Sequence, residues 1–235
     1  MIQRTILFFF VFLSLIIFNN NVNAGVTDLD DPMNVHTGNA SLTINQTPAG
    51  LVFNNDGTKM FTTGSASTDD EINEWDLTTA FDVSTASHVD RLSVVTGDLV
   101  WDSEPFGLTF NDDGTKLFLM GAKDDDLHEI TLGTAYDLST YDDTTVVVWD
   151  INSLDVRACG ITFNNDGTKL FISGFTDSTI IEVPLSTPYS IAESSRGTPE
   201  EYSVFANDRL PRDVDFNSDG TVSYTHLTLP TIYSV

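Results

Sequence analysis

Gly107-Leu-Thr-Phe-Asn-Asp-Asp-Gly-Thr-Lys-Leu-Phe118 decides the fold of this chain, because the sequence of 235 residues contains four copies of this stretch. The copies begin at residues 50, 107, 160 and 213, so successive copies lie 57, 53 and 53 residues apart. The fourth copy, Asp213–Thr221, breaks off after Asp-Gly-Thr. A repeat of this length indicates an architecture in which each unit is one supersecondary element that packs on its neighbours.

Each unit contains the same set of short apolar runs. The Asn-x-Asp-Gly turn between two alternating runs predicts a β-hairpin, because glycine accepts a positive φ without steric cost. A further run precedes this hairpin in each unit, and another follows it. The preceding runs are Ser41–Asn45, Arg91–Val95, Thr145–Trp149 and Glu201–Phe205, and the following runs are Glu71–Leu77, Leu127–Leu132 and Ile180–Leu185. Four short strands every ~40–50 residues are typical of a β-propeller blade.

The units resemble the Phe-x-x-Asp-Gly-Thr-Lys-Leu-Phe repeats of exported bacterial β-propellers, a group that includes YVTN-type and lactonase-like propellers. The resemblance covers residues 40–221 and is specific for the blade, not for an activity. We therefore expect an all-β propeller fragment with about three complete four-stranded blades and a partial fourth. A closed ring needs ~4–8 blades, so these units predict an open arc that belongs to a longer parent protein.

The N-terminus has the pattern of a secretory signal peptide over residues 1–24. Arg4 supplies a positive charge, Ile6–Phe18 is almost wholly apolar, and Val22-Asn23-Ala24 has small residues where a signal peptidase cleaves. The apolar run is short for a permanent membrane span. We expect a mature chain from Gly25 that is secreted, periplasmic or on the cell surface. Residues 25–39 are polar and acidic and predict a flexible lead-in.

The C-terminus departs from the repeat. After Thr221 the pattern requires Lys-Leu-Phe, but the chain reads Val222-Ser-Tyr-Thr-His-Leu-Thr-Leu-Pro-Thr231 and continues to Val235. This string resembles the in-frame translation of a transposase adapter used in sequencing, so residues 222–235 are interpreted as a non-native tail. The alternative is a divergent strand, because Val222–Thr228 alternates between apolar and polar residues.

Composition limits the partners of the chain. Ten Lys and Arg residues stand against 35 Asp and Glu residues, which gives a net charge of −25. Such a surface repels phosphate backbones, so nucleic acid is not an expected partner. The single cysteine, Cys159, excludes an intramolecular disulfide, and we expect it to be a small buried residue.

No residue pattern in the sequence predicts a cofactor, and metal binding is suggested only by acidic loops. Asp69–Glu71 and Lys123–Asp126 allow a weak Ca²⁺ site, although a solvated acidic rim is the favoured interpretation. The Asn54–Thr58 turn and its copies lack the spacing of an EF-hand, and we expect Asn and Asp to bond to their own backbone. His128 is expected to face solvent, and it shares no metal-ligand spacing with His36, His88 or His226.

Propeller ligands usually bind near the central channel, at the loops that enter the innermost strands. Those loops contain five charged residues that we single out as candidate ligand contacts: Glu104, Asp155, Arg157, Arg209 and Arg212. The alternative is that they are ordinary rim charges. The phenylalanines that repeat with the blade are expected to pack between blades.

We therefore expect an exported propeller that acts as a binding or interaction module without catalysis of its own. The first alternative is a lactonase-like hydrolase whose site lies partly in further blades. The second is a structural part of a larger surface or adhesion protein.

Overall fold

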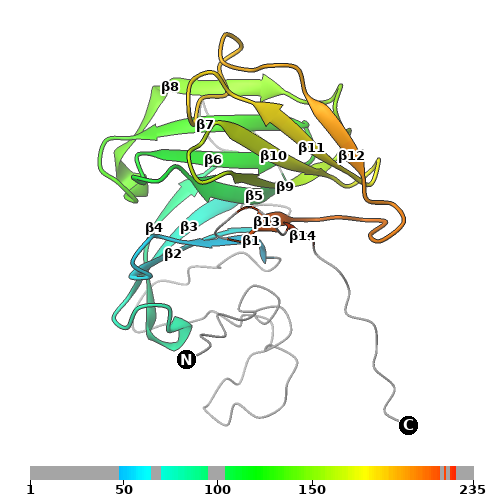
Figure 1. The fold of residues 1–235 in the computed structure, drawn as a ribbon. Helices are drawn as coiled ribbons and strands as arrows, with labels where there is room; N and C mark the ends of the chain where they lie inside the picture. Colours follow the sequence, from blue (N-terminus) through cyan, green and yellow to red (C-terminus); the bar gives the residue numbers. More distant parts are fainter. Residues whose placement is uncertain (1–47, 65–69, 95–103, 218–219, 221–222, 226–235) are drawn as a thin grey trace, which may run out of the picture.

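The computed structural model describes residues 48–64, 70–94, 104–217, 220 and 223–225. These residues form three four-stranded antiparallel sheets and a two-stranded hairpin, with two 3-10 turns and no α-helix among them (Figure 1). Within the same residues, no helix is long and apolar enough to cross a membrane. The predicted signal peptide and lead-in lie outside the described residues.

Each sheet keeps its strands in sequence order, and we call the sheets blades 1, 2 and 3. Blade 1 consists of β1 (Pro48–Phe53), β2 (Lys59–Gly64), β3 (Glu71–Leu77) and β4 (Ala86–Ser93), with η1 (Val83–Thr85) before β4. Blade 2 consists of β5 (Pro105–Phe110), β6 (Lys116–Gly121), β7 (Asp126–Leu132) and β8 (Tyr141–Asp150), with η2 (Leu138–Thr140) before β8. Blade 3 consists of β9 (Ala158–Phe163), β10 (Lys169–Gly174), β11 (Thr179–Pro184) and β12 (Glu200–Ser203). The hairpin of β13 (Val214–Phe216) and β14 (Ser223–Thr225) begins a fourth unit.

The Asp-Gly turn joins the first and second strands of every blade, as predicted. In blade 1, Asn54 Oδ1 accepts a hydrogen bond from the Lys59 backbone N–H at 2.9 Å, and Asp56 Oδ1 accepts one from the Thr58 N–H at 3.0 Å. Gly57 has a φ of 73°, in the left-handed region that glycine enters at no steric cost. The prediction that Asn and Asp bond to their own backbone is confirmed.

The boundary between blades differs from the boundary of the sequence unit. The sequence pattern assigns the runs Arg91–Val95, Thr145–Trp149 and Glu201–Phe205 to the unit of the hairpin that follows each of them. In the structure they belong largely to β4, β8 and β12, which pair with the third strand of the preceding blade. The repeat period alone does not fix where a unit starts. The corresponding run Ser41–Asn45 lies outside the described residues.

Aromatic rings join each blade to the next one. Phe61, Phe118 and Phe171 in the second strands pack on phenylalanines of the following first strand, at centroid distances of 4.7, 4.6 and 4.4 Å. Their partners are Phe110, Phe163 and Phe216. The first strands of successive units are neighbours, so the blades fan outward from them as an open arc (Figure 1). The predicted propeller fragment and the packing role of these rings are confirmed.

His128 corrects the expectation that it faces solvent. Its exposed fraction is 1%, and it lies opposite Leu119 in the register of β6 and β7. Burial lowers the pKa of His128 from 6.5 to about 4. The expectation failed because blade 2 is covered on both faces by its neighbours, so alternation along β7 does not separate a buried face from a solvated one.

Candidate functional site

The candidate site lies where the chain enters the first strands of blades 2 and 3 and of the fourth unit. Glu104 and Arg157 directly precede β5 and β9 and are 53 residues apart, so they occupy equivalent positions on neighbouring blades. The repeat therefore brings them together, and Arg157 Nη2 lies 3.5 Å from Glu104 Oε2. Both side chains are partly exposed, at 44% and 39%.

Phe175 organises the two arginines of the site. The Arg157 Cζ atom lies 5.3 Å from the centroid of the Phe175 ring, and the Arg212 Cζ atom lies 4.9 Å from it. Guanidinium groups are attracted to an aromatic face because the ring carries negative potential there. The ring therefore holds two positive groups from consecutive units at one place. We call Glu104, Arg157, Phe175 and Arg212 the arginine cluster.

Asp155 supports the arginine cluster from below the surface. Its side chain is 1% exposed, and it accepts backbone hydrogen bonds from Arg157 at 2.7 Å, Thr176 at 3.3 Å and Asp177 at 3.0 Å. These bonds tie the loop before β9 to the loop after β10, which carries Phe175. Because it is buried and its two oxygens accept these three N–H groups, Asp155 positions the loops of the cluster.

Arg209 is separate from the arginine cluster. Its Cζ atom lies 5.1 Å from the Phe205 ring, and its carbonyl oxygen accepts a hydrogen bond from Ser178 Oγ at 2.7 Å. The structure thus brings together three of the five predicted residues, places Asp155 as their support and puts Arg209 on a different ring.

Sequence reasoning missed Phe175. The residue directly follows the last glycine of β10. The other units carry Ser65 and Ala122 after the equivalent glycines. A large aromatic residue in a position that is otherwise small is the signal that could have identified it.

Cys159 is buried beside the cluster, as predicted. Its exposed fraction is 1%, and its Sγ atom lies 3.8 Å from the Arg157 carbonyl oxygen. Burial raises the pKa of the thiol to about 11, although Arg212 and Arg157 act in the opposite direction. A thiol of this kind stays protonated at neutral pH and is a poor nucleophile.

The acidic loops are less solvated than expected. Asp70, Glu71 and Asp125 are buried, at 5%, 4% and 6% exposed, which corrects the interpretation as a solvated rim at these three positions, whereas Lys123 and Asp124 are exposed as expected. Glu71 pairs with Arg91 at 3.0 Å, and Asp125 accepts a hydrogen bond from the Asn152 side chain at 3.0 Å. Protein cations and amides thus compensate for the loss of solvent.

Among the described residues, no group of three His, Cys, Asp or Glu side chains is arranged to hold a metal ion. Asp69 lies outside those residues, and calcium binding at these loops stays a prediction.

The fold is that of the β-propeller class, and solved structures support this assignment. No known protein family matches the sequence, and no curated protein matches it. A Bacteroides fragilis protein proposed to be a 6-phosphogluconolactonase is similar in structure, with a TM-score of 0.51 and 16% identity over 76% of this chain and 49% of that chain. The periplasmic gluconolactonase of Pseudomonas aeruginosa gives a TM-score of 0.50 and 14% identity over 76% of this chain and 50% of that one.

A chain from a nidogen–laminin complex is also similar, with a TM-score of 0.51 and 14% identity over 76% of this chain and 56% of that chain. The protein therefore spans about half the length of the propellers that it matches. At these identities the likeness concerns the fold alone.

Proposed function

We propose that this chain is part of an exported β-propeller that binds a small acidic molecule at the arginine cluster, without catalysis of its own. The observation that carries the proposal is the placement of two partly solvated guanidinium groups over the Phe175 ring. Arginine forks bind carboxylate and phosphate groups through paired, charge-assisted hydrogen bonds. The cluster thus gathers two guanidinium groups in a chain of net charge −25, and Glu104 pairs with one of them.

The chemistry of the cluster favours binding over hydrolysis. Asp155 is engaged by three backbone N–H groups, and the buried Cys159 thiol has a pKa of about 11. The thiol is therefore not a nucleophile near neutral pH, and the buried Asp155 carboxylate is held in place as a structural group. Export to the periplasm, the cell surface or the medium is part of the proposal and rests on the signal-like residues 1–24.

Calorimetric titration with gluconate tests the binding proposal, with glucose as the neutral control ligand. We expect gluconate to bind and glucose to give no heat. Removing a charged hydrogen-bond partner by Arg157→Ala or Arg212→Ala is expected to raise the Kd by about 10-fold or more. Arg209→Ala is the matched control, because Arg209 stacks on Phe205 instead of Phe175.

Two results would contradict the binding proposal. One is the absence of heat with gluconate and other acidic sugars at millimolar concentration. The other is a loss of affinity in Arg209→Ala as large as the loss in Arg212→Ala. That result would mean that the ligand responds to overall positive charge and not to the arrangement of guanidinium groups at Phe175.

A lactonase-like hydrolase is the second candidate. It is favoured by Glu104, a partly exposed carboxylate that lies 3.5 Å from a guanidinium group directly before a first strand. Titrimetric measurement of acid release from glucono-δ-lactone tests it. If the unchanged chain hydrolyses the lactone and the Glu104→Gln variant does not, the hydrolase replaces the binding proposal. If both chains give only the spontaneous rate of hydrolysis, the hydrolase proposal is rejected. A structural role in a larger surface protein stays a prediction.

A further inference from the structure

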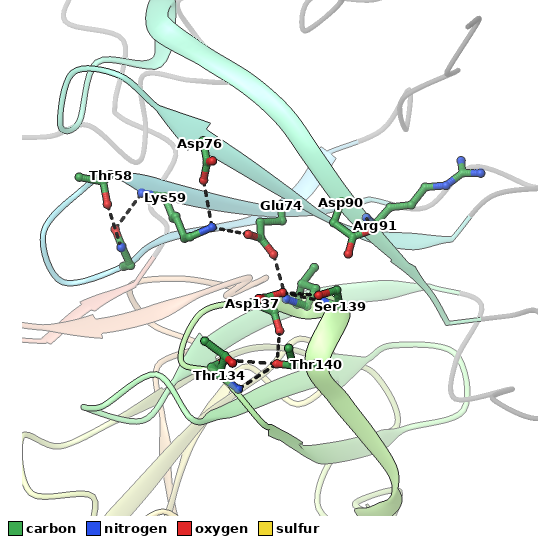
Figure 2. A network of polar contacts seen from close by, with 12 residues as sticks. Thr58, Lys59, Glu74, Asp76, Asp90, Arg91, Thr134, Asp137, Ser139 and Thr140 are labelled. Atoms are coloured by element: carbon green, nitrogen blue, oxygen red, sulfur yellow. Dashed lines mark hydrogen bonds and ion pairs between the residues drawn. The ribbon is translucent and has the colours of Figure 1, made fainter.

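The junction between blades 1 and 2 contains a buried carboxylate that serves both blades. Lys59 of β2 pairs with Glu74 of β3. The second carboxylate oxygen of Glu74 accepts a hydrogen bond at 2.9 Å from the backbone N–H of Leu138, in the loop between the third and fourth strands of blade 2 (Figure 2). The Glu74 side chain is 2% exposed. The glutamate thus joins an ion pair in its own blade to a backbone donor of the next.

The junction between blades 2 and 3 repeats this arrangement. Lys116 pairs with Glu129 at 2.5 Å, and Glu129 Oε2 accepts a hydrogen bond from the Ile191 backbone N–H at 2.9 Å. Lys116 also donates to the carbonyl oxygen of Tyr189 at 2.8 Å. In both junctions the N–H donor lies two residues after an aromatic residue of the loop, Tyr136 or Tyr189. The Glu129 side chain is 7% exposed.

Blade 3 carries the third copy of the pair, and its carboxylate lies more open to solvent. Lys169 Nζ lies 2.6 Å from Glu182 Oε1, but the Glu182 side chain is 32% exposed. No further blade loop lies beyond it among the described residues. The ion pair is therefore present within blade 3. Glu182 Oε2 is equivalent to the oxygen atoms of Glu74 and Glu129 that accept a backbone N–H from the next blade.

The outer strand of blade 3 shows the same difference. Leu92, Trp149 and Tyr202 occupy equivalent register positions, opposite Ile72, Leu127 and Ile180. Leu92 is 5% exposed, whereas Tyr202 is 73% exposed. The Trp149 ring is covered by Arg196 of blade 3, whose Cζ atom lies 4.3 Å from its centroid.

The inner part of the same face is already covered. Phe216 of β13 packs on Phe171 at 4.4 Å, as the preceding pairs do at the two other junctions. The start of a fourth unit is thus seated on blade 3 in the geometry that the complete blades use, and only the outer part of the face is open.

We propose that Lys169, Ile180, Glu182 and Tyr202 form a docking surface for a further blade of the same repeat. The occupant is the loop between the third and fourth strands of that blade. Its backbone N–H, two residues after the loop aromatic, donates to Glu182 Oε2, and the residues that follow cover Tyr202. The proposal commits to this occupant because the surface continues an interface that is already formed twice in the chain.

The test compares the existing chain with a chain in which a second copy of residues 168–203 follows Gly220. This extension continues the β13 hairpin into a complete fourth blade, because residue 220 is equivalent to residue 167. Glu182→Ala is made in both chains, with the glutamate of the added copy left unchanged, and urea unfolding gives the folding equilibrium constant. Glu129→Ala in both chains is the matched control.

We expect Glu182→Ala to lower the folding constant less than about 5-fold in the existing chain, as for an exposed ion pair. In the extended chain we expect a loss of about 10-fold or more, because a charge-assisted hydrogen bond is removed as well. Glu129→Ala is expected to lower the constant by about 10-fold or more in both chains. Nitration of Tyr202, followed by mass spectrometry, is expected to be several-fold slower in the extended chain.

Three outcomes would overturn the proposal. The first is an equal effect of Glu182→Ala in the two chains. The second is an unchanged nitration rate of Tyr202, whether the added blade folds elsewhere or does not fold. The third is protection of Tyr202 that grows with the concentration of the existing chain, because this result would assign the surface to a second copy.

Discussion

Replacing Gly114 by alanine tests how the hairpin turn is coupled to the aromatic loop of the same blade. Gly114 has a φ of 72°, and a Cβ atom added there would lie 2.2 Å from Cε2 of the Tyr136 ring. The Tyr136 ring in turn packs on Phe110 at a centroid distance of 4.9 Å. The substitution therefore strains the backbone and displaces a ring that belongs to the junction between blades 1 and 2.

The expected loss of stability follows from these two effects. A left-handed conformation costs an L-residue about 1–2 kcal/mol. Displacing the Tyr136 ring from Phe110 removes an aromatic pair worth about 0.5–1.5 kcal/mol beyond area burial. Alanine also lowers the conformational entropy of the unfolded state, and this effect offsets less than about 1 kcal/mol of the loss. We expect the free energy of unfolding to fall by about 1–3 kcal/mol.

Gly220 provides the matched control, since it has a φ of 68° and no atom within 4 Å of an added Cβ. Gly220→Ala therefore introduces the backbone strain without the ring clash, in a hairpin at the edge of the arc. Urea denaturation followed by tryptophan fluorescence and circular dichroism gives both values. A loss for Gly114→Ala below about 0.5 kcal/mol, or one equal to that of Gly220→Ala, would refute the reasoning.

Two further predictions concern buried titratable groups. Burial raises the pKa of Cys159 to about 11, so we expect the thiol to react with a disulfide reagent at pH 8 much more slowly than after unfolding; equal rates would contradict its burial. The pKa of His128 is lowered from 6.5 to about 4, so the unfolded chain binds its proton first as the pH falls. The contribution of neutral His128 to the free energy of unfolding is fully present above pH 6.5. It decreases as the pH falls toward 4, by about 3 kcal/mol in all. His128→Ile introduces the residue type that blade 3 carries at the equivalent position, Ile181. We expect this variant to lose less stability between pH 7 and pH 4.5, as measured by urea unfolding at both values. An unchanged pH dependence would contradict the prediction.

The blade could be predicted from sequence because its determinants are local and repeated. The Asn-x-Asp-Gly turn forms its own hydrogen bonds within six residues, as Asn54 and Lys59 illustrate. Each turn therefore predicts its hairpin without knowledge of the rest of the chain. The constant spacing then predicts that Phe61 and Phe110 meet, because equivalent strands of neighbouring blades lie side by side.

Burial could not be predicted in the same way, because it depends on which faces the neighbouring blades cover. His128, Glu129 and Asp125 are polar residues that a single-sheet interpretation places in solvent, yet all are buried. Glu129 is tolerated there because Lys116 and a backbone N–H from blade 3 compensate for its loss of water. These partners come from strands and loops that the local pattern around Glu129 does not contain.

The distribution of the few cations gives the arginine cluster its significance. The chain has ten Lys and Arg residues against 35 acids, and three of the ten, Lys59, Lys116 and Lys169, pair with the junction glutamates. Each of those three lysines faces at least one carboxylate. Arg157 and Arg212 are arranged differently, because both guanidinium groups approach the same Phe175 ring, and Arg157 also pairs with Glu104.

The two guanidinium groups at the Phe175 ring carry like charges and repel each other. An anion bound between the two guanidinium groups would offset this repulsion. This is the physical reason to look for the ligand at Phe175 and not among the acidic loops.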